Sequence, residues 1–110
     1  MTVDPGYLAH LYDVVMERRN AAPDQSYVAA LFAKGKSRIA QKVGEEAVET
    51  AIAAVSESRE ALISESADLL FHMLILWADA GIRPEDVLQA LQQREGTSGL
   101  AEKRNRSSDS

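Results

Sequence analysis

The segment RIAQKVGEEAVETAIAAVSES, residues 38–58, decides the fold because it continues for more than about five helical turns without a proline. Each residue of an α-helix advances about 100° around the axis, so the segment can be divided into faces. Three glutamates and two basic residues share one face, whereas valines and alanines occupy the other. The charged face comprises Arg38, Lys42, Glu45, Glu46 and Glu49. We therefore predict an amphipathic helix that begins at a capping Ser37.

A second long helix is predicted for residues 59–80, with Gly81 as its C-terminal stop. The short link between the two helices makes them antiparallel neighbours. Glu65 and Asp68 are three residues apart on the second helix and therefore point the same way. Antiparallel pairing then brings the pattern EExxE of residues 45–49 opposite the pattern ExxD of residues 65–68.

The stretch from Leu69 to Trp77 is apolar on every side of the second helix except at His72. A helix of this kind must be covered all round. The other predicted helices, near residues 5–20, 24–35 and 84–94, provide little material to do so. We therefore predict an all-α protein, an antiparallel helical bundle of four to five helices that is completed by a homodimer or a higher homo-oligomer.

The chain has 110 residues, a formal net charge of -5 and no cysteine. This length suits one domain, which we place at residues 1–94, and we expect the polar tail of residues 95–110 to be disordered. The acidic balance argues against a general nucleic-acid binder. The lack of cysteine excludes disulfides, zinc thiolate sites and thiol nucleophiles, and it fits a cytoplasmic location.

No segment of the sequence resembles a signal peptide or a membrane span. The N-terminus lacks a basic region followed by an apolar stretch. The longest nearly apolar run, residues 69–78, is far shorter than the roughly 20 residues that cross a bilayer. We therefore expect a soluble protein without a membrane partner.

The tripeptide Gly35-Lys36-Ser37 resembles the end of a phosphate-binding P-loop. A true P-loop reads G-x-x-x-x-G-K-[ST] after a β-strand, whereas Ala30 stands at its first glycine position here and the preceding residues favour helix. We interpret Gly35 as the stop of one helix and Ser37 as the start of the next. The basic group around it could be a solvated loop or could bind phosphate; it comprises Lys34, Lys36, Arg38 and Lys42.

Five carboxylates in one cleft repel one another unless a cation neutralises them. Oxygen ligands suit Mg²⁺ or Mn²⁺, which keep positions free for water and substrate phosphates. The alternative is a solvated acidic face, because EExxE alone is common on exposed helices. Its pairing with ExxD directly before an apolar run favours a metal site. For His72 we expect a core histidine that is hydrogen-bonded to a neighbour.

The segments KVGEEAVET (residues 42–50) and ESADLLFHMLILW (residues 65–77) closely resemble the phosphoribosyl-ATP pyrophosphohydrolase family of the all-α MazG-like pyrophosphohydrolases. The resemblance extends from Tyr7 to Arg94, and residues 27–42 resemble the part that distinguishes this family from general MazG proteins. It implies hydrolysis of 1-(5-phosphoribosyl)-ATP to 1-(5-phosphoribosyl)-AMP and pyrophosphate, the second step of histidine biosynthesis.

The resemblance also implies roles for individual residues. Glu45 would orient or deprotonate the attacking water, and Glu49 would be both catalytic and a metal ligand. The basic group would neutralise phosphate charge. Because the chain is short and lacks cysteines, the resemblance implies the stand-alone form rather than a fusion with the cyclohydrolase of the next step. The implied metal ligands are Glu46, Glu49, Glu65 and Asp68.

Two other functions remain open on the sequence. A house-cleaning NTP or dUTP pyrophosphohydrolase on the same scaffold would share the acids and the metal but differ in the basic group. A non-catalytic helical dimerisation module would carry the acids only as a solvated face and would bind no Mg²⁺.

Overall fold

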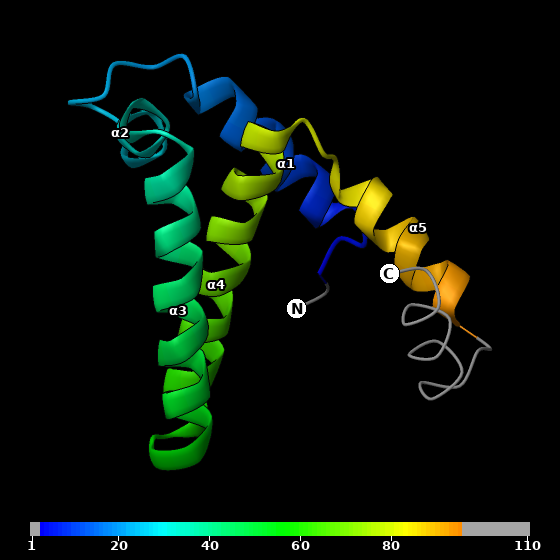
Figure 1. Ribbon diagram of the computed structural model, residues 1–110. Helices are drawn as coiled ribbons and strands as arrows, with labels where there is room; N and C mark the ends of the chain where they lie inside the picture. The colour runs from blue at the N-terminus through cyan, green and yellow to red at the C-terminus, as the bar shows by residue number, and fades with distance from the viewer. Residues whose placement is uncertain (1–2, 96–110) are drawn as a thin grey trace, which may run out of the picture.

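The computed structural model describes residues 3–95, and throughout this range the ordered elements are helices without any strand (Figure 1). The predicted all-α class is therefore confirmed. Apart from Glu95, the predicted polar tail lies outside the described residues. The five helices are α1 (Tyr7–Arg18), α2 (Tyr27–Lys34), α3 (Lys36–Ser56), α4 (Arg59–Ala80) and α5 (Pro84–Arg94).

Most helix ends follow the local signals in the sequence. The Ser26 hydroxyl accepts a hydrogen bond from the Ala29 N–H at 3.2 Å and so caps α2. Ser58 caps α4 in the same way through the Ala61 N–H at 3.1 Å. Gly81 ends α4 with a φ of 74°, the left-handed conformation that glycine adopts without strain. The predicted stop at Gly81 is confirmed.

The prediction that Ser37 caps the third helix is wrong. Helix α3 already begins at Lys36, and Gly35 both ends α2 and precedes α3. Gly35 has a φ of 94°, which L-amino acids with side chains rarely adopt, and its N–H donates to the Phe32 carbonyl at 3.1 Å. Because this one glycine redirects the chain from α2 into α3 by itself, no linker is needed and Ser37 lies inside the first turn.

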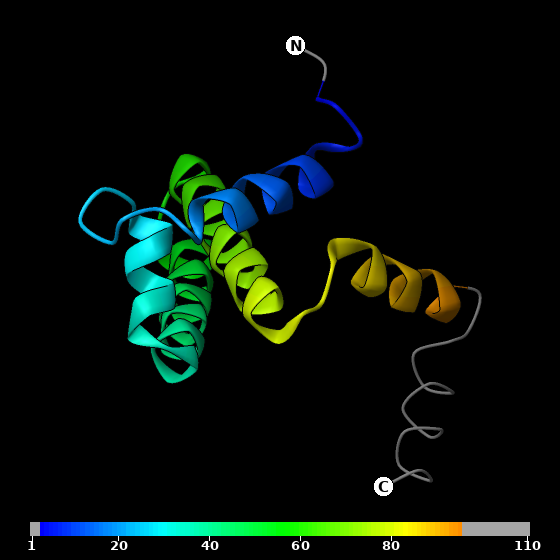
Figure 2. The same ribbon diagram turned by 90° about the horizontal axis from the view of Figure 1, so that it is seen from above.

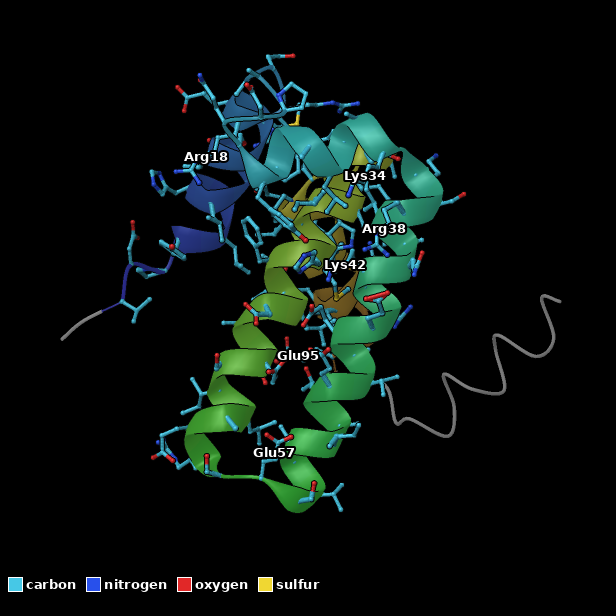
Figure 3. The ribbon with its side chains drawn as sticks, turned by 90° about the vertical axis from the view of Figure 1, so that its left-hand side faces the viewer. Arg18, Lys34, Arg38, Lys42, Glu57 and Glu95 are labelled. Atoms are coloured by element: carbon cyan, nitrogen blue, oxygen red, sulfur yellow. The ribbon has the colours of Figure 1, made fainter. Side chains whose placement is uncertain are left out.

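The long helices α3 and α4 lie side by side and are joined at one end by residues 57–58 (Figures 1 and 3). At the other end α1 and α2 pack against the pair. Helix α5 touches α1 and otherwise extends away from the rest, as Figure 2 shows from above. The core therefore lies where α1 and α2 meet the pair. Its buried residues are Tyr12, Val15, Val28, Leu31, Ile39, Leu74, Ile75 and Ala78.

Several large apolar side chains remain uncovered on α3, α4 and α5. On α3, Val48, Ile52 and Val55 are 59%, 50% and 86% exposed. These three positions recur at helical spacing and share one face of the helix. On the other helices Ile63, Leu70, Leu88 and Leu91 are also exposed. Within residues 69–77, by contrast, Leu70 is the exposed residue and the others are buried or half-buried, so the uncovered apolar surface lies mainly outside the stretch from which we predicted it.

Helix α4 has 22 residues and a mean hydropathy of 1.4 in its most apolar window, so length and composition alone would allow it to cross a membrane. The core helix of a soluble protein meets the same criteria. Helix α4 packs against α3 and α1, contributes Leu74 and Ile75 to the core, and carries Glu65 and Asp68 in its first half. Carboxylates are costly inside a bilayer, so we assign α4 as a core helix.

Candidate functional site

Three acidic side chains from two helices converge between α3 and α4. Each of Glu46, Glu49 and Glu65 offers one carboxylate oxygen, and these three oxygens lie within 4.8 Å of one another. Glu46 and Glu49 lie one turn apart on α3, and Glu65 faces them from α4. We call these residues the carboxylate group. The structure thus brings Glu46 and Glu49 of the EExxE pattern opposite Glu65 of the ExxD pattern.

The carboxylate group is suited to a divalent metal ion. Glu46 Oε2 and Glu65 Oε2 are both buried, and neither has a hydrogen-bond partner among the described residues. A buried carboxylate oxygen without a partner is costly, and neighbouring carboxylates also repel one another. A cation held between them would remove both penalties. Because all the ligand atoms are oxygens, Mg²⁺ or Mn²⁺ fits this group best.

Asp68, the fourth ligand implied by the family resemblance, does not join the carboxylate group. It lies one turn beyond Glu65 on α4, and its carboxylate is not among those that converge within 4.8 Å of one another. Its backbone carbonyl lies 2.7 Å from His72 Nδ1. The structure thus places three of the four predicted metal ligands together.

Lys42 lies next to the carboxylate group on α3 (Figure 3). Its ammonium nitrogen is 3.5 Å from Glu46 Oε1 and 3.7 Å from Glu45 Oε2. Burial acts to lower the pKa of Lys42, but Tyr27, Glu45 and Glu46 outweigh it and raise this pKa above its ordinary value. Lys42 therefore carries a positive charge at neutral pH, directly beside the candidate metal site.

Glu45 is held by side chains on its own helix. Its Oε1 accepts a hydrogen bond from Gln41 Nε2 at 2.9 Å and lies 3.4 Å from Arg38 NH1. Its Oε2 faces Lys42. Glu45 thus links Arg38 to Lys42, and Lys42 in turn pairs with Glu46 of the carboxylate group.

The other two predicted phosphate-binding residues lie apart from this cluster. Lys36 is the first residue of α3, and its Nζ is 3.8 Å from Oδ2 of Asp79 on α4. Lys34 is exposed and forms no ion pair with residues 3–95. Figure 3 shows Lys34, Arg38 and Lys42 along the upper part of α2 and α3. Arg38 and Lys42 thus pair with the glutamates of α3, whereas Lys36 pairs with Asp79.

His72 is a buried histidine with two hydrogen-bond partners, which confirms the expectation for this residue. Its Nδ1 faces the Asp68 carbonyl, which can only accept, so Nδ1 carries the proton. In the neutral ring Nε2 then accepts a hydrogen bond from the Tyr27 hydroxyl at 2.7 Å. A single histidine in an apolar stretch indicates that another residue must provide a hydrogen bond to its ring. The sequence does not show that this residue is Tyr27.

Thr50 is a second residue that the sequence did not single out. Its hydroxyl lies 2.8 Å from the Glu46 carbonyl and 3.1 Å from the Glu65 carbonyl. The first of these contacts is within α3, whereas the second crosses to α4. Thr50 therefore connects the two helices at the residues that carry the buried carboxylates.

A family model described as phosphoribosyl-ATP pyrophosphohydrolase matches residues 8–95 of this chain. The chain belongs to the phosphoribosyl-ATP pyrophosphohydrolase family. The matched range contains the whole carboxylate group, the basic group, Tyr27 and Thr50. The family resemblance seen in residues 42–50 and 65–77 is therefore confirmed over most of the chain.

Curated relatives support the same assignment to the phosphoribosyl-ATP pyrophosphohydrolase family. A phosphoribosyl-ATP pyrophosphatase of Paramagnetospirillum magneticum is 52% identical over 96% of this chain and 97% of its own length. One from Azospirillum brasilense is 55% identical over 96% of both chains. One from Rhizorhabdus wittichii is 58% identical over 89% of this chain and 92% of its own length. The similarity thus covers nearly the entire length of these relatives.

Proposed function

We propose that this chain hydrolyses the α–β phosphoanhydride of 1-(5-phosphoribosyl)-ATP to give 1-(5-phosphoribosyl)-AMP and pyrophosphate, the second step of histidine biosynthesis. The observation that carries this proposal is the convergence of Glu46, Glu49 and Glu65, with two unpartnered buried oxygens, inside a domain of this family. The proposed location is the cytoplasm.

The proposed cofactor is Mg²⁺, with Mn²⁺ as a substitute. Glu46, Glu49 and Glu65 would hold it, and Asp68 is the proposed fourth ligand. Once bound, such an ion neutralises the acids, polarises a phosphoryl group and lowers the pKa of a coordinated water. The two unpartnered oxygens, Glu46 Oε2 and Glu65 Oε2, support this choice because they need a positive partner.

Lys42 and Arg38 supply the positive charge that the triphosphate requires outside the metal site. The pKa of Lys42 lies above its ordinary value, so its ammonium is charged at neutral pH and can hold a phosphate oxygen. Arg38 can bind phosphate through its planar fork of donors. Lys34 and Lys36 stay candidates for more distant phosphate oxygens.

Glu45 is the proposed general base for the attacking water, and Glu49 assists from within the carboxylate group. The hydrogen bond from Gln41 and the ion pair with Arg38 orient the Glu45 carboxylate. The water oxygen forms a bond to the α-phosphorus while one of its protons passes to the Glu45 carboxylate. The bond between the α-phosphorus and the oxygen that bridges it to the β-phosphorus breaks, and pyrophosphate leaves with that oxygen.

Release of pyrophosphate from phosphoribosyl-ATP, compared with ATP and dUTP under the same conditions, tests the proposed substrate. We expect kcat/KM for phosphoribosyl-ATP to exceed the other values on the order of 10³-fold, because bound substrate groups provide discrimination of this size. Faster turnover of dUTP or ATP would identify a house-cleaning enzyme. No turnover of any nucleotide together with no Mn²⁺ binding would identify a non-catalytic module.

We further propose that the helices form an antiparallel bundle that a second copy of the chain completes. The exposed face of Val48, Ile52 and Val55 on α3 supports this assembly, because apolar stripes of this kind are usually covered. The proposed partner is a second identical chain, since a homodimer is the simplest closed assembly.

Light scattering at micromolar concentration should report a dimer, and Ile52→Asp should shift it to a monomer. Ile52 is 50% exposed in the single chain, so an aspartate there should destabilise a dimer interface far more than it destabilises the folded monomer. Ala54→Asp is the matched control, because Ala54 is exposed on a different face of α3. A monomeric wild-type protein, or a dimer that tolerates Ile52→Asp, would contradict the proposed assembly.

A further inference from the structure

Thr50 lies within α3 at a position where the helix itself does not require a side-chain hydroxyl. Helical threonines commonly donate to the carbonyl four residues earlier, and Thr50 does so with Glu46 at 2.8 Å. That carbonyl already accepts the regular backbone hydrogen bond of the helix, so it does not depend on the hydroxyl. Ala47, Ala51, Ala53 and Ala54 lie within four residues of Thr50 in α3, and alanine is the better helix former. Local structure therefore does not account for a threonine here.

The second contact of the hydroxyl reaches the neighbouring helix. Thr50 Oγ1 lies 3.1 Å from the carbonyl oxygen of Glu65, so its single hydrogen is shared between acceptors on α3 and α4. Within residues 3–95, this is the hydrogen bond that joins α3 directly to α4. The ion pair of Lys36 with Asp79, also between these helices, lies near the start of α3.

The two carbonyls that Thr50 bridges belong to Glu46 and Glu65, and each of these residues has a buried carboxylate oxygen without a hydrogen-bond partner. Repulsion between these carboxylates acts to separate α3 from α4 at this level before a cation is bound. The hydroxyl opposes that separation directly beside the acids. Mg²⁺ demands near-ideal ligand geometry, so a small change in the spacing of the two helices should alter its binding.

We propose that Thr50 is a positioning residue for the carboxylate group: its hydroxyl sets the spacing of Glu46 and Glu65 across the two helices and thereby the affinity of the site for a divalent ion. This inference rests on the proposed metal-dependent function. It assigns Thr50 no contact with the substrate or the reacting atoms.

Titration with Mn²⁺, followed by calorimetry or by the electron paramagnetic resonance of free Mn²⁺, tests this role without any turnover. Thr50→Val keeps the shape and removes the hydroxyl, and we expect it to weaken Mn²⁺ binding about 10- to 100-fold, as for other groups that orient metal ligands. Thr50→Ser retains the hydroxyl and should restore affinity to within about threefold. In assays, Thr50→Val should raise the Mg²⁺ concentration for half-maximal activity more than it lowers kcat at saturating Mg²⁺.

Ser56→Ala is the matched control. Ser56 Oγ donates to the Ile52 carbonyl at 2.9 Å, the same contact within α3, but it does not reach α4. Its loss should leave Mn²⁺ affinity unchanged. Wild-type affinity in Thr50→Val would overturn the proposal, as would a weakened affinity that Thr50→Ser fails to restore, since packing would then be the cause. A wild-type protein that binds no Mn²⁺ would overturn the proposed function itself, and the role of Thr50 with it.

Discussion

Replacing Glu65 by glutamine is expected to lower kcat on the order of 10³-fold and, at the same time, to raise the melting temperature of the metal-free protein. Glutamine has the shape of glutamate but no charge, so the site loses a ligand for the cation. The Glu65 carboxylate lies within 4.8 Å of two others and has a buried oxygen without a partner. Removing its charge relieves this repulsion, which we expect to add about 1 kcal/mol to the free energy of unfolding.

Pyrophosphate release at saturating Mg²⁺ and calorimetry in the presence of a chelator measure the two effects of Glu65→Gln. Glu60→Gln is the control, because Glu60 is an exposed acid in the first turn of the same helix. It should retain activity within about twofold, as surface substitutions usually do. A solvated acidic face would instead make the two substitutions equivalent, with activity and stability changed little by either.

Replacing Lys42 by methionine is expected to lower kcat/KM for phosphoribosyl-ATP about 10²-fold and to destabilise the protein, opposite to the stability effect of Glu65→Gln. Methionine keeps most of the apolar length but removes the charge beside the substrate phosphates. It also leaves Glu46, which is 7% exposed, without its cationic neighbour. We expect this loss to reduce the free energy of unfolding by about 1–3 kcal/mol in the metal-free protein.

Lys34→Met provides the comparison for Lys42→Met. Lys34 belongs to the same predicted basic group, but it is exposed and has no ion pair within the described part of the chain. Because Lys34 is proposed to reach only a more distant phosphate oxygen and is solvated, its replacement should lower kcat/KM much less than Lys42→Met does, by at most about threefold. Steady-state assays and chemical unfolding of both variants measure these effects. If Lys34→Met were the more damaging of the two, the phosphates would lie nearer the start of α3 than we propose.

The part of the site that lies within single helices could be predicted from the sequence. Residues three or four apart share a helix face, so Glu46 and Glu49 had to lie together and close to Lys42. The end of α4 and the start of α5 were also predicted, because Gly81 and Pro84 act through their own backbone conformation. The start of α3 was not, because the sequence did not reveal that Gly35 alone would take the positive φ that redirects the chain from α2 into α3.

Sequence alone determined an all-α chain of the phosphoribosyl-ATP pyrophosphohydrolase family, with a charged stripe on α3 and an acid pair on α4. Only the tertiary structure decided which of these side chains meet. Its packing brings Glu65 but not Asp68 into the carboxylate group. It also pairs Lys36 with Asp79 rather than with a member of the carboxylate group. The physical reason is that local periodicity defines the faces of a helix, whereas side-chain packing between helices sets how each helix is rotated against its neighbour.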